Sequence, residues 1–180
     1  MGDPDNPQAS SRGLGRGMVI AAWVLLLVLL TLFFNDRLDE QNNPNQQLSA
    51  ITVDGAPEVT LQRNRFGHYV ATGSINGKPV EFMLDTGATD VSIPAKLADK
   101  LGLQRGRATV YQTANGPITA WQTSLDEIQL GPLRQGPVRA SINPNDSTHA
   151  VLLGMSFLRH LDFKQQGNTL TLSYPRPENP

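Results

Sequence analysis

The chain has 180 residues, and its 15 lysines and arginines nearly balance its 16 aspartates and glutamates, for a net charge of −1. This length accommodates one domain plus an appendage, and the balanced charge gives no case for a nucleic-acid partner. The chain has no cysteine, which excludes disulfides, thiolate metal sites, a cysteine nucleophile and lipidation at cysteine.

Three segments are predicted before the folded domain. Residues 1–17 are rich in Gly, Pro, Asn, Asp and Ser and lack apolar periodicity, so we expect them to be disordered. Residues 18–34 carry no charge, and as a helix they would span roughly 26 Å, near the hydrocarbon thickness of a bilayer, which predicts a transmembrane helix. Residues 35–57, rich in Asn, Gln, Pro and charge, predict a flexible linker.

Residues 18–34 have two other interpretations, a cleaved signal peptide and a buried helix of a soluble domain. A signal peptide would need a small-x-small site directly after its core, but Phe33-Phe34-Asn35-Asp36-Arg37 follows, which favours an uncleaved anchor. A helix that is apolar on every face would not suit the surface of a small β-rich domain. Basic residues are more frequent before the segment than after it, which favours a cytoplasmic N-terminus and an exported C-terminal domain.

Residues 58–175 predict an all-β domain of short strands broken by turns, and residues 176–180 a short tail. Asn76-Gly77 is a strong signal for a type I′ hairpin. A short helix is predicted at 94–101, with Gly102 as its stop. The predicted strands are 59–61, 68–75, 79–84, 91–93, 108–113, 118–125, 128–130, 138–142 and 151–153, followed by a final hairpin over 161–174.

Asp85 stands at the end of a buried strand, in a tight polar turn. Because strands are predicted on both sides, the loop from Asp85 to Thr89 must reverse or bend sharply, and Gly87 permits that bend. Asp-Thr-Gly by itself is a common turn tripeptide without chemistry. A carboxylate on a loop between two rigid strands is nevertheless where an active site needs an acid.

A longer match is more specific than the tripeptide. Phe82-Met83-Leu84-Asp85-Thr86-Gly87-Ala88, followed by Ser92 and Ile93, resembles the active-site segment of the retropepsin-like aspartic proteases. Val151-Leu152-Leu153-Gly154, followed by a predicted short helix, is similar to that family's second signature. The resemblance covers residues 59–174 and implies a closed β-barrel or sandwich with one or two short helices. It is nearest to the bacterial, membrane-anchored branch, which implies the cell inner membrane and a periplasmic C-terminal domain.

The resemblance also implies a homodimer in which two copies of Asp85 hold a water molecule between them. One carboxylate would act as base toward the water while the other, protonated, donates to the scissile carbonyl. Thr86 would hydrogen-bond across the dimer, Gly87 would leave room for the substrate backbone, and Ala88 belongs to the same match. No second Asp-Thr-Gly or Asp-Ser-Gly occurs in the chain, so two copies are needed for two carboxylates.

In the same plan the hairpin over 108–125 is the flap that closes over the substrate and excludes water. Tyr111, Asn115 and Gly116 would then contact substrate, while Leu153 and Gly154 support the active-site loop; an ordinary surface hairpin is the alternative. The sequence departs from the retroviral members at Thr89 and Met155. Those members carry there an acid and an arginine whose ion pair supports the dimer, so the dimer here must be held differently.

The expected partners are a peptide or protein substrate, bound in an extended form between flap and floor, and a membrane through residues 18–34. We expect no cofactor and no metal, because His68, His149 and His160 lack metal-ligand spacing. Three alternatives remain: a non-catalytic, membrane-tethered peptide-binding or scaffolding domain, a domain that stays monomeric and inert, and a dehalogenase-like phosphoaspartate loop. The last needs a second carboxylate two residues further on.

Overall fold

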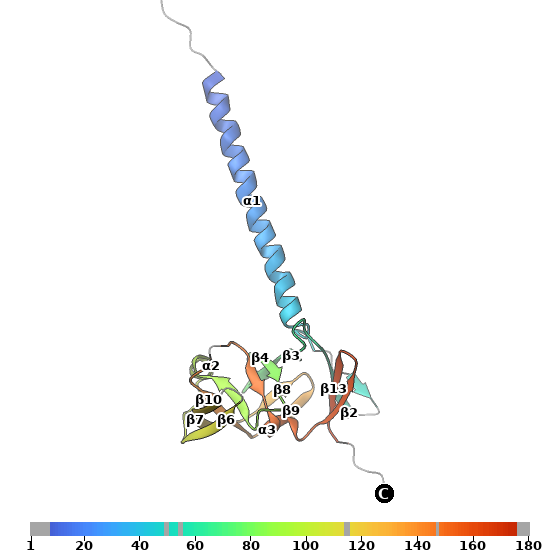
Figure 1. Ribbon diagram of the computed structural model, residues 1–180. Helices are drawn as coiled ribbons and strands as arrows, with labels where there is room; N and C mark the ends of the chain where they lie inside the picture. Colours follow the sequence, from blue (N-terminus) through green and yellow to red (C-terminus); the bar gives the residue numbers. More distant parts are fainter. Residues whose placement is uncertain (1–7, 49–50, 54–55, 114–115, 147, 176–180) are drawn as a thin grey trace, which may run out of the picture. The chain divides into compact units, whose positions relative to one another are not determined.

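The structure, a computed structural model, describes residues 8–48, 51–53, 56–113, 116–146 and 148–175. It divides into two units, Met1–Asp39 and Glu40–Pro180. The first unit holds most of a single helix, and the second is a β-rich domain (Figure 1).

Helix α1 spans Gln8–Asn42, so it starts earlier and ends later than residues 18–34. Its part from Gly17 to Asn42 is long and apolar enough to cross a membrane, and none of its most apolar window is buried, unlike a core helix. A signal sequence can be equally long and apolar, so membrane insertion stays a prediction. Residues 8–17 are helical here rather than disordered. Residues 35–42 are also helical rather than flexible, because they contain no glycine or proline, and Pro44 stands just beyond the end.

Asn43 and Asn45 are buried in the domain although they fall in the predicted flexible linker. The side-chain amide of Asn45 donates to the carbonyls of Gln62 and Val70 at 2.9 and 2.6 Å, and its Oδ1 accepts from the Gln62 amide at 2.7 Å. Asn43 donates to the Thr72 hydroxyl at 3.0 Å. This part of the linker is therefore a fixed part of the domain, because asparagine side chains take the place of strand-to-strand hydrogen bonds.

Two sheets make up the domain. The smaller has the order β1-β2-β13-β12 and the larger the order β6-β7-β10-β5-β11-β4-β3-β8-β9. The bounds are β1 Ile51–Val53, β2 Ala56–Gln62, β3 Val70–Ile75, β4 Lys78–Leu84, β5 Val91–Pro94, β6 Ala108–Thr113, β7 Gly116–Leu125, β8 Ile128–Leu130, β9 Leu133–Gln135, β10 Val138–Asn143, β11 Val151–Leu153, β12 Asp162–Gln166 and β13 Thr169–Ser173.

The all-β class and the two short helices, α2 (Ala95–Leu101) and α3 (Met155–Leu158), are confirmed. The closed barrel is not observed: within the described ranges both sheets have two separate end strands, and β6 pairs with β7 alone. The type I′ hairpin is supported by Asn76 and Gly77, whose φ angles are 50° and 77°. Gly102 ends α2 in the left-handed conformation, as predicted.

Strand β11 lies between β4 and β5, the strands that enter and leave the Asp85 loop. It runs parallel to β4, with Leu153 opposite Leu84, and antiparallel to β5, with Leu152 opposite Ser92. The neighbouring side chains of Phe82, Val91, Ile93, Leu153 and Phe157 are fully buried. The loop therefore projects from the rigid centre of the larger sheet.

Candidate active site

The Asp85 loop is held by backbone groups of its own chain. The Asp85 amide donates to the Leu153 carbonyl at 3.2 Å, and the Ala88 amide donates to the Asp85 carbonyl at 3.2 Å. The Gly87 amide donates to Asp85 Oδ1 at 2.9 Å. A Cβ atom at Gly87 would lie 3.1 Å from that oxygen, so glycine leaves the carboxylate the room to receive this bond.

Gly154 brings the second motif into contact with the same loop. A Cβ atom at this position would lie 2.2 Å from the Asp90 carbonyl oxygen and 2.7 Å from that of Ala88. At the start of α3 the amides of Met155 and Ser156 donate to the carbonyls of Ala88 and Thr89 at 2.8 and 2.9 Å. Leu153 and Gly154 thus contact the Asp85 loop through backbone groups, and their role in supporting it stays a prediction.

Ser156 adds a contact that the sequence did not indicate. Its hydroxyl accepts from the Val91 amide at 3.0 Å and donates to the Arg139 carbonyl at 2.7 Å. One buried hydroxyl therefore joins α3, the start of β5 and β10 just below the loop.

A cleft of ≈ 290 Å³ opens beside Asp85. Its floor includes Ser141, Ser92 and Leu152, which lie in register across β10, β5 and β11. The β6–β7 hairpin forms the opposite wall. The lining residues are Asp85, Gly87, Ala88, Thr89, Asp90, Ser92, Tyr111, Gln112, Thr113, Ile118, Ser141, Asn143 and Leu152.

Four of the nine predicted site residues line this cleft. They are Asp85, Gly87, Ala88 and Tyr111. Thr86 is exposed on the surface of the loop. Gly116 begins β7 with a φ of 100°, beyond the set of lining residues, and Asn115 lies outside the described residues.

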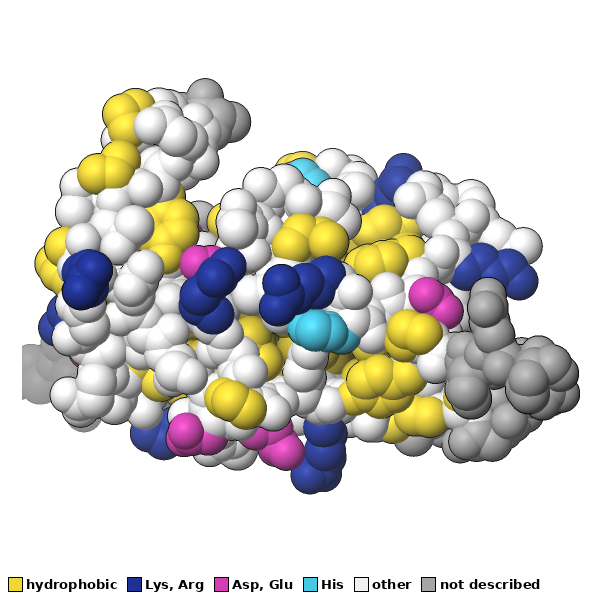
Figure 2. Space-filling view, turned by 90° about the horizontal axis from the view of Figure 1, so that it is seen from below, with side chains coloured by type: hydrophobic (Ala, Val, Ile, Leu, Met, Phe, Trp, Pro, Cys, Tyr) yellow, Lys and Arg dark blue, Asp and Glu magenta, His cyan; other side chains and the backbone are white. Residues whose placement is uncertain are grey.

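The domain surface does not form a single charged region on the face seen from below. Figure 2 shows basic, acidic and hydrophobic side chains interspersed there, with a hollow beside an arm on the left, the side on which Figure 1 draws β6 and β7. This face offers no continuous cationic surface, in keeping with the balanced charge of the chain.

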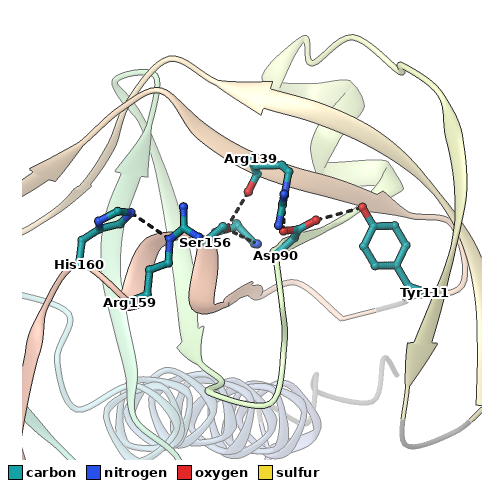
Figure 3. A network of polar contacts seen from close by, with 7 residues as sticks. Asp90, Tyr111, Arg139, Ser156, Arg159 and His160 are labelled. Atoms are coloured by element: carbon teal, nitrogen blue, oxygen red, sulfur yellow. Dashed lines mark hydrogen bonds and ion pairs between the residues drawn. The ribbon is translucent and has the colours of Figure 1, made fainter.

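Asp90 is a second acid at the cleft, and its side chain is only 5% exposed. Oδ1 accepts from Nε of Arg139 at 2.7 Å, and Oδ2 accepts from the Tyr111 hydroxyl at 3.1 Å (Figure 3). Burial, and then the hydrogen bond to Asp90, raise the pKa of the Tyr111 phenol above its ordinary value. The same carboxylate raises the pKa of Arg139.

Sequence reasoning missed this network. Asp90 could have been noticed as a carboxylate directly before a buried strand, where an acid needs a partner. No local pattern marked Arg139, because it lies 49 residues after Asp90 in the chain. The two residues meet only because β10 runs parallel to β5 in the larger sheet.

Taken together, a single carboxylate on a glycine loop, a second glycine motif beneath it and a hairpin across the cleft define the class of aspartic-protease folds. The family described as gag-polyprotein putative aspartyl protease matches residues 71–160, half of the chain. The chain belongs to this family.

A solved structure and two relatives are similar to the chain. The crystal structure of a retropepsin-like aspartic protease from Rickettsia conorii is similar, with a TM-score of 0.54 and 26% identity, over 71% of this chain and 95% of that chain. An uncharacterized protein in the cobV 5′ region of Sinorhizobium sp is 29% identical, over 87% of this chain and 72% of its own length. Uncharacterized protein RP867 of Rickettsia prowazekii (strain Madrid E) is 24% identical, over 86% and 70%. The retropepsin-like fold expected from the sequence is thus confirmed.

Proposed function

We propose that the chain is a membrane-anchored aspartic endopeptidase that hydrolyses peptide bonds as a homodimer. The observation that carries the proposal is the position of Asp85: it lines a cleft, and a backbone amide holds one of its two carboxylate oxygens. A fixed carboxylate beside a groove with a hairpin wall is the arrangement that peptide hydrolysis by an activated water needs.

The mechanism requires two copies of Asp85. Two carboxylates about 3 Å apart cannot both be ionised, so the pair holds one proton. The ionised member takes a proton from the bound water, and the water oxygen attacks the scissile carbonyl carbon. The protonated member donates its proton to the carbonyl oxygen, giving a tetrahedral diol. The C–N bond then breaks as the first member gives its proton to the amine nitrogen and the second takes a proton from a diol hydroxyl, which leaves a carboxylic acid, a free amine and one proton on the pair.

Thr86 has a role in this proposal that one chain cannot complete. Thr86 is exposed beside Asp85, so its hydroxyl is available for a hydrogen bond to the loop of a second copy. Tyr111 would contact substrate from the hairpin wall, with Asn115 and Gly116 at the turn. Leu153 and Gly154 would keep the loop in place.

The anchor is the apolar part of α1, with a cytoplasmic N-terminus and the catalytic domain in the periplasm of a bacterial cell. Substrates would then be exported or membrane-proximal polypeptides, bound in an extended conformation. Fractionation after alkaline extraction tests the anchor, and protease accessibility of the domain in intact spheroplasts tests its orientation. A domain protected from added protease would overturn the orientation.

The catalytic test uses the full chain in detergent micelles and a peptide library at pH 4 to 7. Asp85→Asn should abolish cleavage, whereas Asp99→Asn, the same chemical change at an exposed ion pair with Arg105, should leave it intact. Cleavage that persists in Asp85→Asn would overturn the proposal.

Mixing the active protein with Asp85→Asn tests whether the site needs two copies. If subunits exchange freely, an equal mixture holds about one quarter active dimers, and its activity per total protein should fall accordingly. A fall to one half would indicate that each chain acts alone.

A non-catalytic peptide-binding domain is the second candidate, because the cleft and its hairpin wall are formed within one copy. In that case peptides would bind equally to the natural protein and to Asp85→Asn, and neither would cleave them.

A further inference from the structure

The hairpin of β6 and β7 has a weak attachment to the rest of the domain on its β6 side. Among the strands of the described residues, β6 is the end strand of the larger sheet and pairs with β7 alone. None of its side chains is fully buried. An end strand with little buried surface gains little from packing, so other contacts decide how closely it stays over the cleft.

The phenol of Tyr111 supplies such a contact. Tyr111 lies in the middle of β6, and its hydroxyl donates to Asp90 Oδ2 at 3.1 Å. Asp90 follows the Asp85 loop directly, and both Tyr111 and Asp90 line the cleft. This hydrogen bond therefore joins the hairpin wall to the loop wall across the cleft.

Asp90 is held at its end of this contact without help from Tyr111. Its other oxygen accepts from Nε of Arg139, whose charge compensates the buried carboxylate. The residue after Asp90, Val91, is fixed by the Ser156 hydroxyl, which also binds the Arg139 carbonyl. Figure 3 shows Asp90 between Arg139 and Tyr111. The carboxylate is thus a fixed acceptor, and the part of the hairpin beyond Trp121, where β7 no longer pairs with β10, is the part that can move.

We propose that Asp90 and Tyr111 form a latch that holds the β6–β7 hairpin over the cleft, with Arg139 as the support of its fixed end. A peptide that enters the cleft must pass beneath this hydrogen bond or break it, so the latch sets how often the cleft is open. Asp90 and Tyr111 are positioning residues in this role. The inference rests on the proposed function for its consequence on cleavage, but the motion of the hairpin can be measured separately.

Hydrogen exchange of the full chain in detergent micelles tests the latch. Tyr111→Phe keeps the ring and removes only the hydroxyl. Because a hydrogen bond to a charged group is lost, we expect the backbone amides of β6 and β7 to exchange about tenfold faster in this variant. Tyr174→Phe is the matched control, because the Tyr174 hydroxyl bonds to the backbone of Arg134 instead. It should leave the hairpin unchanged. Equal exchange of the hairpin in Tyr111→Phe and the natural protein would overturn the latch.

A spectroscopic readout separates the hydrogen bond from ring packing. In Asp90→Asn the phenol of Tyr111 should ionise at a lower pH than in the natural protein, because the negative partner that opposes its ionisation is gone. An unchanged titration in a folded variant would overturn the latch. If Asp90→Asn does not fold, the exchange of Tyr111→Phe decides alone.

Peptide cleavage measured on the same preparations keeps the two proposals apart. Faster hairpin exchange in Tyr111→Phe, together with no cleavage by the natural protein, would support the latch and overturn the protease. Cleavage by the natural protein, together with unchanged exchange in Tyr111→Phe, would overturn the latch and leave the protease standing.

Discussion

Replacing Asn45 by alanine should destabilise the domain strongly, although composition places this residue in a linker. The substitution removes three hydrogen bonds, to the carbonyls of Gln62 and Val70 and from the Gln62 amide. The bond to Val70 is buried and the two to Gln62 are partly buried. Each lost bond that leaves a shielded group unpaired costs about 1 kcal/mol or more, so we expect a loss of about 3 kcal/mol in the free energy of unfolding.

Thermal unfolding of the full chain in micelles, followed by circular dichroism of the β-rich domain, measures this loss. For a chain of this size, about 3 kcal/mol corresponds to a fall in Tm of roughly 6 to 12 °C. Gln46→Ala is the matched control, because Gln46 is an exposed neighbour in the same segment, and its Tm should stay within about 2 °C of the natural value.

If Asn45→Ala and Gln46→Ala both unfold at the same temperature as the natural protein, Asn45 does not stabilise the domain. That result would mean that residues 43–48 contribute no stability and act as the flexible linker that their composition indicates. Confirmation would set the start of any soluble form at or before Glu40, the first residue of the second unit.

Three further substitutions test other contacts. Gly154→Ala should lower the free energy of unfolding by about 3 kcal/mol or more, because its Cβ would lie 2.2 Å from the Asp90 carbonyl oxygen; a Tm near the natural value would contradict this. Ser156→Ala should cost about 2 kcal/mol, measured by denaturant unfolding, since the Val91 amide and a β10 carbonyl lose their partner; a cost near zero would mean that water replaces the hydroxyl. The raised pKa of Tyr111 means that its contribution to stability is complete below pH 10.0 and is lost as the pH rises through the higher folded value. Tyr111→Phe should therefore flatten the alkaline part of a plot of stability against pH, and an identical slope would refute the assignment.

The parts of the fold that could be predicted from the sequence are those with local causes. Asn76-Gly77 forms its hairpin because both residues adopt positive φ. The loop at Asp85 and the close approach at Gly154 follow from glycine motifs whose geometry has few alternatives. The alternation of β5, with Val91 and Ile93 in the core and Ser92 in the cleft, follows from the two-residue period of a strand.

The parts that could not be predicted depend on partners far away in the chain. Asn43 and Asn45 look like linker residues until β2 and β3 present backbone groups to them, since composition does not report where an amide finds its partners. The open ends of the larger sheet depend on strand order, which no local pattern encodes. The pairing of Asp90 with Arg139 depends on the same order.

The network around Asp90 also bears on how two copies would meet. In retroviral members an acid directly before this position pairs with an arginine after the second-motif glycine and supports the dimer. Here the corresponding positions are Thr89 and Met155, and the nearest acid, Asp90, is buried against Arg139 and Tyr111 of its own chain. The charge that could have supported a dimer is therefore used to fix the cleft within one copy. On the proposed mechanism, cleft formation and dimerisation are then separate steps. Peptide binding should increase in proportion to protein concentration, whereas cleavage, for which the proposal requires two Asp85 residues, should increase more steeply.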